Sequence, residues 1–167
     1  MTLTLAQWAA QINVTDAKAA VGSGQAVDNF AATARTAFTI GTGSGAVDVM
    51  WRDQRQLVGT SEDLDLAGVL TNQFGAVATF AKVRGIYIRN TETGAGKTLS
   101  VGGAAANQFL TPFGAADDKV KIGPGGVLML TSPVDGFAVT AGTGDKLKID
   151  AGAQTITYEI CIVGTSV

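Results

Sequence analysis

The stretch that decides the fold is residues 155–162, Thr-Ile-Thr-Tyr-Glu-Ile-Cys-Ile, in which two kinds of side chain alternate. Successive side chains of a β-strand point to opposite faces, so strict alternation predicts a half-buried strand. One face would carry Ile156, Tyr158, Ile160 and Ile162, and the other Thr155, Thr157, Glu159 and Cys161.

The same period recurs back along the chain to Val47. Further predicted strands are Val47–Trp51, Lys82–Arg89, Leu99–Val101, Val120–Ile122, Val127–Leu130, Phe137–Val139 and Leu147–Ile149. Glycine-rich turns separate them at Thr93–Gly96, Gly123–Gly126, Ala141–Gly144 and Asp150–Ala153. About eight or nine short strands with close turns indicate an all-β, antiparallel β-sandwich or barrel. We favour a jelly-roll-like sandwich over an up-and-down barrel, although the pattern leaves the strand order open.

The first third of the chain differs because it is rich in alanine. Leu5–Ile12 and Gln25–Arg35 are compatible with short helices, separated by the Gly-Ser-Gly of residues 22–24. Helices this short would need tertiary packing to hold them. The alternative is an extended N-terminal arm that orders only against a partner. We therefore expect an arm or short helices over residues 1–35 and a β-sandwich domain over residues 36–167.

The composition narrows the possible functions. The 167 residues are 46% hydrophobic and only 16% charged, with 22 glycines and a net charge of −2. Such sparse charge indicates a protein whose surface is covered by neighbours, as in a homo-oligomer or larger assembly. The chain has no basic cluster of the kind that binds nucleic acid, so no nucleic-acid partner is expected. It also has no apolar run long enough to predict a membrane span. The N-terminus does not resemble a signal peptide, so synthesis in a cytoplasm is expected.

The residue inventory argues against an enzyme. The chain has no histidine and one cysteine, which excludes histidine-based triads and the usual zinc sites. We therefore expect no catalytic, cofactor-binding or metal-binding residues. Cys161 lies within a predicted strand, where a buried and inert thiol is expected.

Two glycine-rich segments could be interpreted as nucleotide-binding motifs. Gly94–Thr98 resembles the end of a P-loop, but Thr91 stands where the first glycine is required, and a strand follows. Gly41–Ala46 fits a dinucleotide fingerprint, yet it also precedes a predicted strand, not a helix. Both segments are predicted to be turns.

Clustered carboxylates and tryptophans are the remaining candidates. Glu62–Asp65 and Asp117-Asp118 are predicted to be solvated loops, with a weak cation site as the alternative. Trp51 is in phase with its apolar neighbours and is predicted to lie in the core. Trp8 either anchors the N-terminal segment to the sandwich or contacts a partner, and it is the one candidate partner-contact residue.

Several stretches resemble structural proteins of tailed bacteriophages. They are Trp51–Leu57 with Ser61–Leu66, Val83–Asn90, Lys121–Leu128 and Ala141–Ile149. The resemblance covers about residues 47 to 167, rests on turn and strand signatures and offers no catalytic residues to transfer. Among such proteins are capsid decoration, or cement, proteins, which are β-sandwiches and often jelly rolls.

The resemblance implies a virion protein that binds and stabilises the capsid lattice. Its partners would be the major capsid protein and copies of itself, and it would lie on the capsid surface after synthesis in the host cytoplasm. Alternatives are a tail or neck ring component, or a glycan-binding β-sandwich module with an aromatic platform on its surface.

Overall fold

The structure, a computed structural model, describes residues 3–19 and 25–167. Twelve strands and no helix occur in this part of the chain, and nearly all strand pairs are antiparallel. The predicted all-β fold is therefore confirmed. Since the described residues hold no helix at all, they hold none long and apolar enough to cross a membrane.

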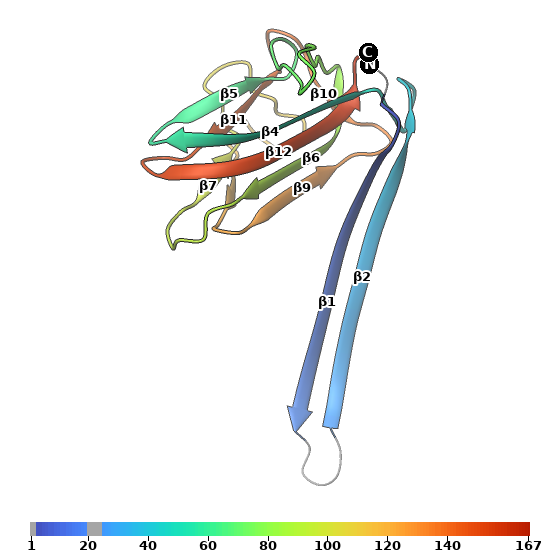
Figure 1. Cartoon of the computed structure of the whole chain (residues 1–167), viewed down its shortest axis with the longest axis vertical. Helices are drawn as coiled ribbons and strands as arrows, with labels where there is room; N and C mark the ends of the chain where they lie inside the picture. Colours follow the sequence, from blue (N-terminus) through green and yellow to red (C-terminus); the bar gives the residue numbers. More distant parts are fainter. Residues whose placement is uncertain (1–2, 20–24) are drawn as a thin grey trace.

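Residues 49–167 form two sheets that face each other as a β-sandwich (Figure 1). The first sheet has the order β10-β6-β12-β4. Strand β9 pairs with the same edge of β6 as β10 does, but further along β6. The strands of this first sheet are β4 (Val49–Val58), β6 (Lys82–Asn90), β9 (Val127–Thr131), β10 (Phe137–Ala138) and β12 (Thr155–Thr165). The second sheet has the order β5-β11-β7-β8. Its strands are β5 (Ser61–Asp65), β7 (Leu99–Val101), β8 (Val120–Ile122) and β11 (Lys146–Asp150).

The core lies between these sheets and follows the predicted alternation. Ile156, Tyr158, Ile160 and Ile162 of β12 are all buried there, as are Leu147 and Ile149 of β11. Central strand β12 pairs with β4 on one side and β6 on the other. The stretch that predicted the fold is thus the middle of the larger sheet.

Tight connections join the two sheets at both open edges. Gly59 lies between β4 and β5, and Gly125 lies between β8 and β9. Both glycines have positive φ, at 59° and 69°, a conformation that glycine adopts without steric cost. These turns hold the edge strands of opposite sheets close together.

The N-terminal region is a long β-hairpin, which corrects the helical alternative. β1 (Ala6–Ala19) and β2 (Gln25–Ile40) pair antiparallel over their length, and short β3 (Ala46–Val47) adds parallel to the end of β2. Alanine favours helices, but the propensity is weak and cross-strand pairing overrides it here. The hairpin leaves the sandwich at its base and extends well beyond it (Figure 1). The expected boundary at residue 35 falls within β2.

The prediction that Glu62–Asp65 is a solvated loop was also wrong. These residues belong to β5, which pairs with β11. Leu64 is only 3% exposed because it points into the core, while Glu62 finds polar partners between the sheets. Internal pairing of a carboxylate removes the need for solvation that the sequence suggested.

Candidate docking surface

The hairpin is an amphipathic ribbon. Directly opposed residues of an antiparallel pair share a face, and every second residue along a strand returns to it. From the sandwich outward, one face carries the pairs Trp8–Thr36, Ala10–Ala34, Ile12–Ala32, Val14–Phe30 and Asp16–Asp28. We call the three middle pairs the apolar hairpin face. The opposite face carries Gln7–Ala37, Ala9–Arg35, Gln11–Thr33, Asn13–Ala31 and Thr15–Asn29, and is largely polar.

None of the residues that the structure describes covers the apolar hairpin face. Ile12, Val14 and Phe30 are 53%, 51% and 58% exposed. An isolated two-stranded ribbon is marginally stable in water, and a contiguous exposed apolar surface typically marks an interaction site. The apolar hairpin face is therefore the best candidate for a docking surface.

Among the residues that the structure describes, only β3 pairs with an outer edge of the hairpin, so both long edges are open over most of their length. β1 and β2 contain no proline, and their register is continuous without a bulge. Proteins usually protect exposed edge strands with prolines, bulges or charges, because unpaired N–H and C=O groups invite further pairing. The lack of prolines and bulges in these two strands supports the same assignment.

Two carboxylates end the apolar face at its outer limit. Asp16 lies directly opposite Asp28, and both are exposed. Like charges in this position destabilise a β pair. Neither carboxylate forms a salt bridge within the described residues. Lys18 shares this face by register, but its side chain lies outside the described ones.

The base of the hairpin is fixed to the outer surface of the first sheet by Trp8. The indole lies over Gly85 of β6, where an added Cβ would be 2.8 Å from Cε2 and Nε1 of the ring. The Trp8 and Tyr87 ring centroids are 6.5 Å apart. Phe38 is buried in the same small cluster with Val47 and Val163. A glycine on β6 thus makes the flat seat on which the tryptophan packs.

The structure places Trp8 on the sandwich, where it is half-buried. Sequence reasoning offered this position as one of two alternatives. A contact between Trp8 and a partner stays a prediction.

An apolar hollow of about 360 Å³ lies beside Trp8. Its lining includes Leu3, Leu5, Met50, Tyr87, Cys161 and Val163. Cys161 is half-buried, and burial raises the pKa of its thiol, which keeps it protonated and weakly reactive. The hollow adjoins the apolar hairpin face because Trp8, which lines the hollow, lies on the same side of the ribbon as Ala10.

Arg52 is a cation close to Cys161, which lines this hollow. It lies opposite Cys161 in the register of β4 and β12, and its positive charge lowers the pKa of that thiol in opposition to burial. The Arg52 side chain is exposed and makes no salt bridge within the described part of the chain.

A buried arginine clamps the loop that follows the hairpin. Arg84 is 2% exposed, and its guanidinium donates hydrogen bonds to the carbonyl oxygens of Gly43 and Pro133 at 3.0 Å and of Val134 at 2.5 Å. Carbonyl dipoles, not a carboxylate, therefore balance its charge. Arg84 ties the β2–β3 turn to the β9–β10 connection.

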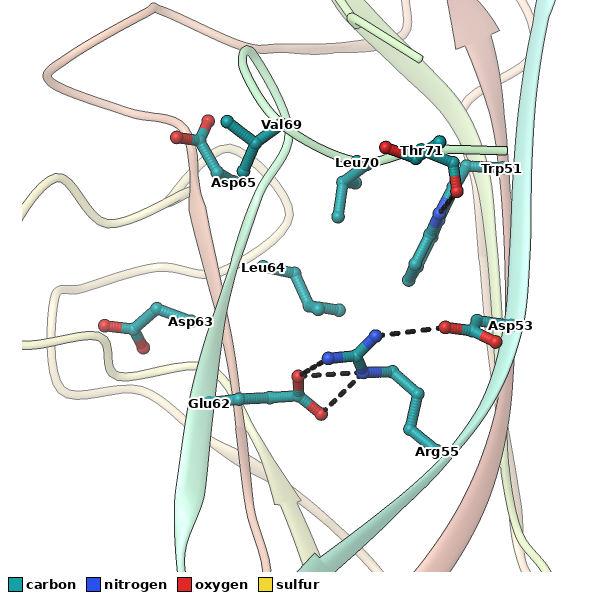
Figure 2. Close-up of a pocket in the computed structure, with 10 residues that line it drawn as sticks. All are labelled: Trp51, Asp53, Arg55, Glu62, Asp63, Leu64, Asp65, Val69, Leu70 and Thr71. Atoms are coloured by element: carbon teal, nitrogen blue, oxygen red, sulfur yellow. Dashed lines mark hydrogen bonds and ion pairs between the residues drawn. The ribbon is translucent and has the colours of Figure 1, made fainter. Parts of the chain in front are cut away.

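A second hollow, of about 330 Å³, opens between β4 and β5 (Figure 2). Arg55 lies between Glu62 and Asp53 and donates from Nε to both Glu62 oxygens, at 2.8 and 3.0 Å. The buried Tyr158 hydroxyl donates to Glu62 at 2.7 Å. The hydrogen bond from Arg55 to Glu62 raises the pKa of Arg55, and burial raises that of Tyr158. These groups satisfy one another, so the arrangement seals the edge of the core.

Trp51 also lines this hollow. It is 2% exposed, and its Nε1 donates to the Thr71 carbonyl oxygen at 3.2 Å. The predicted core position is confirmed. Trp51 is therefore not the exposed aromatic platform that a glycan-binding module would present.

The glycine-rich segments are turns, as predicted. Strand β7 follows Gly94–Thr98, and the Lys97 ammonium donates to the Thr155 carbonyl oxygen at 2.8 Å. Gly41–Ala46 leads directly into β3. Asp118 lies in an exposed loop, as expected, and accepts hydrogen bonds from two backbone amides there. No group of three or more potential metal ligands occurs in the described residues.

Comparison with protein-family models, curated proteins and solved structures finds no match to this chain. The resemblance to bacteriophage structural proteins therefore stays a prediction.

Proposed function

We propose that this protein is a structural component of a tailed-phage particle, which binds the capsid lattice as a decoration (cement) protein and stabilises it. The observation that supports this proposal most directly is the apolar hairpin face, carried on a sandwich with a well-packed core. The face exposes Ile12, Val14 and Phe30, which a protein working alone in water gains nothing by exposing.

A jelly-roll classification of the sandwich belongs to the same proposal. The sheets contain the rows β9-β6-β12-β4 and β8-β7-β11-β5, so the first and last sandwich strands are neighbours. Successive strands cross from one sheet to the other at β4–β5, β5–β6 and β6–β7. Two interlocked Greek keys of this kind define a jelly roll, an architecture used in capsid and lectin domains.

Stabilisation of a capsid in this way follows from linkage. A protein that binds the assembled lattice but not free coat subunits lowers the free energy of the assembled state alone. Symmetry repeats each small contact many times around the particle, which supplies avidity without one strong site.

The direct test uses the full-length protein and expanded capsids that lack decoration. We expect the protein to co-sediment with these capsids and to raise their melting temperature. Phe30→Asp should abolish binding. Phe74→Asp is the matched control, because Phe74 is 69% exposed on the sandwich and lies far from the hairpin in sequence. Equal binding to unassembled coat subunits, or loss of binding with Phe74→Asp but not Phe30→Asp, would contradict the proposal.

A tail or neck ring component is the second candidate. The same exposed hairpin could join neighbouring copies in a ring. A density map of particles containing the protein separates the two candidates by location.

A further inference from the structure

From the order of side chains along the apolar hairpin face, we infer that it docks a second copy of this chain, with the two hairpins face to face and antiparallel about a two-fold axis at Ile12. This inference deepens the proposed function, since it names the contact through which copies of the protein associate. It rests on three observations: side-chain size, charge and the adjoining hollow beside Trp8.

Side-chain size increases outward along the face, and this gradient is self-complementary when two copies are antiparallel. The Ala10–Ala34 pair is small, and the Val14–Phe30 pair is large. A two-fold axis at the Ile12–Ala32 pair places the large pair of each copy on the small pair of the other. Large residues facing small ones give the close packing that stable interfaces need. The same surface patch is then used by both copies, as a two-fold interface requires.

Charge is complementary in the same arrangement. The axis at Ile12 brings Asp16 and Asp28 of each copy to the Trp8 end of the other hairpin. Arg52 lies at that end, beside the hollow, and is exposed without a salt bridge in the described residues. A parallel arrangement would instead stack the Asp16–Asp28 pairs of the copies on one another, and like charges disfavour it.

The area decides how much of the contact the hairpins alone supply. Because Trp8 packs on its own sheet, the contact surface runs from the Ala10 pair to the Asp16 pair and is about 20 Å long and about 10 Å wide, giving about 200 Å² on each copy. Stable interfaces bury about 1,200 Å² or more in total, about three times what two such surfaces give. The remainder must come from the Asp16–Asp28 end of each hairpin against the partner's sandwich. The hollow of about 360 Å³ beside Trp8 lies where that end would arrive. Such a dimer is weak and depends on concentration.

Cross-linking tests the face and the register together. In a Cys161→Ser background, Ile12→Cys places one thiol of each copy at the two-fold axis, and a bifunctional maleimide should yield covalent dimers. Gln11→Cys is the matched control, because it occupies the adjacent position on the opposite face. We expect dimers from Ile12→Cys and monomers from Gln11→Cys. Equal cross-linking of the two variants would overturn the inference.

Charge reversal tests the partner. By sedimentation velocity across a concentration series, Arg52→Glu should weaken dimerisation by about ten-fold, as should Asp16→Lys with Asp28→Lys. The triple variant should restore it. Far-UV circular dichroism of each variant reports whether the sandwich stays folded.

Because these measurements use purified protein, their failure is distinct from failure of the proposed function. A chain that is monomeric up to millimolar concentration overturns the inference. If that monomer also binds capsids through Phe30, the hairpin face is occupied by coat protein, and the proposed function survives.

Discussion

Replacement of Gly85 by alanine tests how the hairpin is held to the sandwich. A Cβ at Gly85 would lie 2.8 Å from the Trp8 indole, whereas carbon atoms in contact are normally about 3.5–4.0 Å apart. The ring must therefore move by roughly 0.7–1.2 Å or leave its seat. Because Phe38 and Val163 pack in the same cluster, the indole has little room to shift without disturbing them.

The cost of this change can be bounded. Removing a fully buried tryptophan or phenylalanine costs about 3–5 kcal/mol, so loss of half-buried Trp8 from its seat costs about 2 kcal/mol. Alanine in a strand recovers about 0.5–1 kcal/mol relative to glycine. Gly85→Ala should therefore destabilise the protein by about 1–1.5 kcal/mol. In a Trp8→Ala background the steric conflict disappears, and Gly85→Ala should stabilise the protein by about 0.5–1 kcal/mol.

Denaturant unfolding of the four proteins in this double-mutant cycle gives the result directly. Because Trp51 is buried, a red shift of the emission in Gly85→Ala would report exposure of Trp8. The expected signature is a change of sign between the two backgrounds. An equal effect of Gly85→Ala with and without Trp8 would refute the steric argument.

Three further predictions concern the core edge, the arginine clamp and the hairpin. Burial raises the pKa of Tyr158 above its ordinary 10.0, so the unfolded chain ionises first and stability should fall above pH 10 by up to about 1.4 kcal/mol per pH unit. Thermal melts at alkaline pH should show a shallower fall for Tyr158→Phe, and an unchanged slope would disprove the assignment. Arg84→Met should cost about 1–2 kcal/mol and accelerate hydrogen exchange at the Ala46 amide, whereas unaltered exchange would show that the clamp is unimportant. Joining Ala10 to Ala34 through an Asn-Gly turn should change the unfolding free energy by less than about 1 kcal/mol while abolishing dimerisation, and a dimer that persists would place the interface elsewhere.

The sandwich strands were predictable from the sequence because their alternation is strict. In β12, every second side chain is a large apolar residue that ends in the core. Turn glycines marked where most of the strands end. The strand order was not predictable, since it depends on which strands far apart in sequence pair with each other.

The hairpin was missed for a chemical reason. From Trp8 to Val14, the even positions are apolar and the odd positions are mostly polar, which is the pattern of a strand. Alanine occurs on both faces, however, and it weakens the contrast while favouring a helix locally. Strand β5 was missed because Glu62 is paired with Arg55 and Tyr158. Neither partner can be identified from the sequence around Glu62 alone.

The candidate site was predictable only in part. Trp8 was singled out, but Gly85, on which it packs, lies 77 positions further along the chain. No local pattern signals such a contact. Arg84 was likewise undetectable as a clamp, because its acceptors are backbone carbonyl groups that carry no sequence signature.

The position of β12 has a consequence for how the molecule forms. This strand is the last in chain order, yet it lies between β4 and β6. A chain that emerges from the ribosome cannot complete the larger sheet until β12 has been synthesised, and closing such distant pairings is slow. The β1–β2 hairpin involves only neighbouring segments and can zip up within microseconds. Its exposed apolar face would then be present while the sandwich is still incomplete. Premature association of nascent copies through this face is therefore the expected route to aggregation.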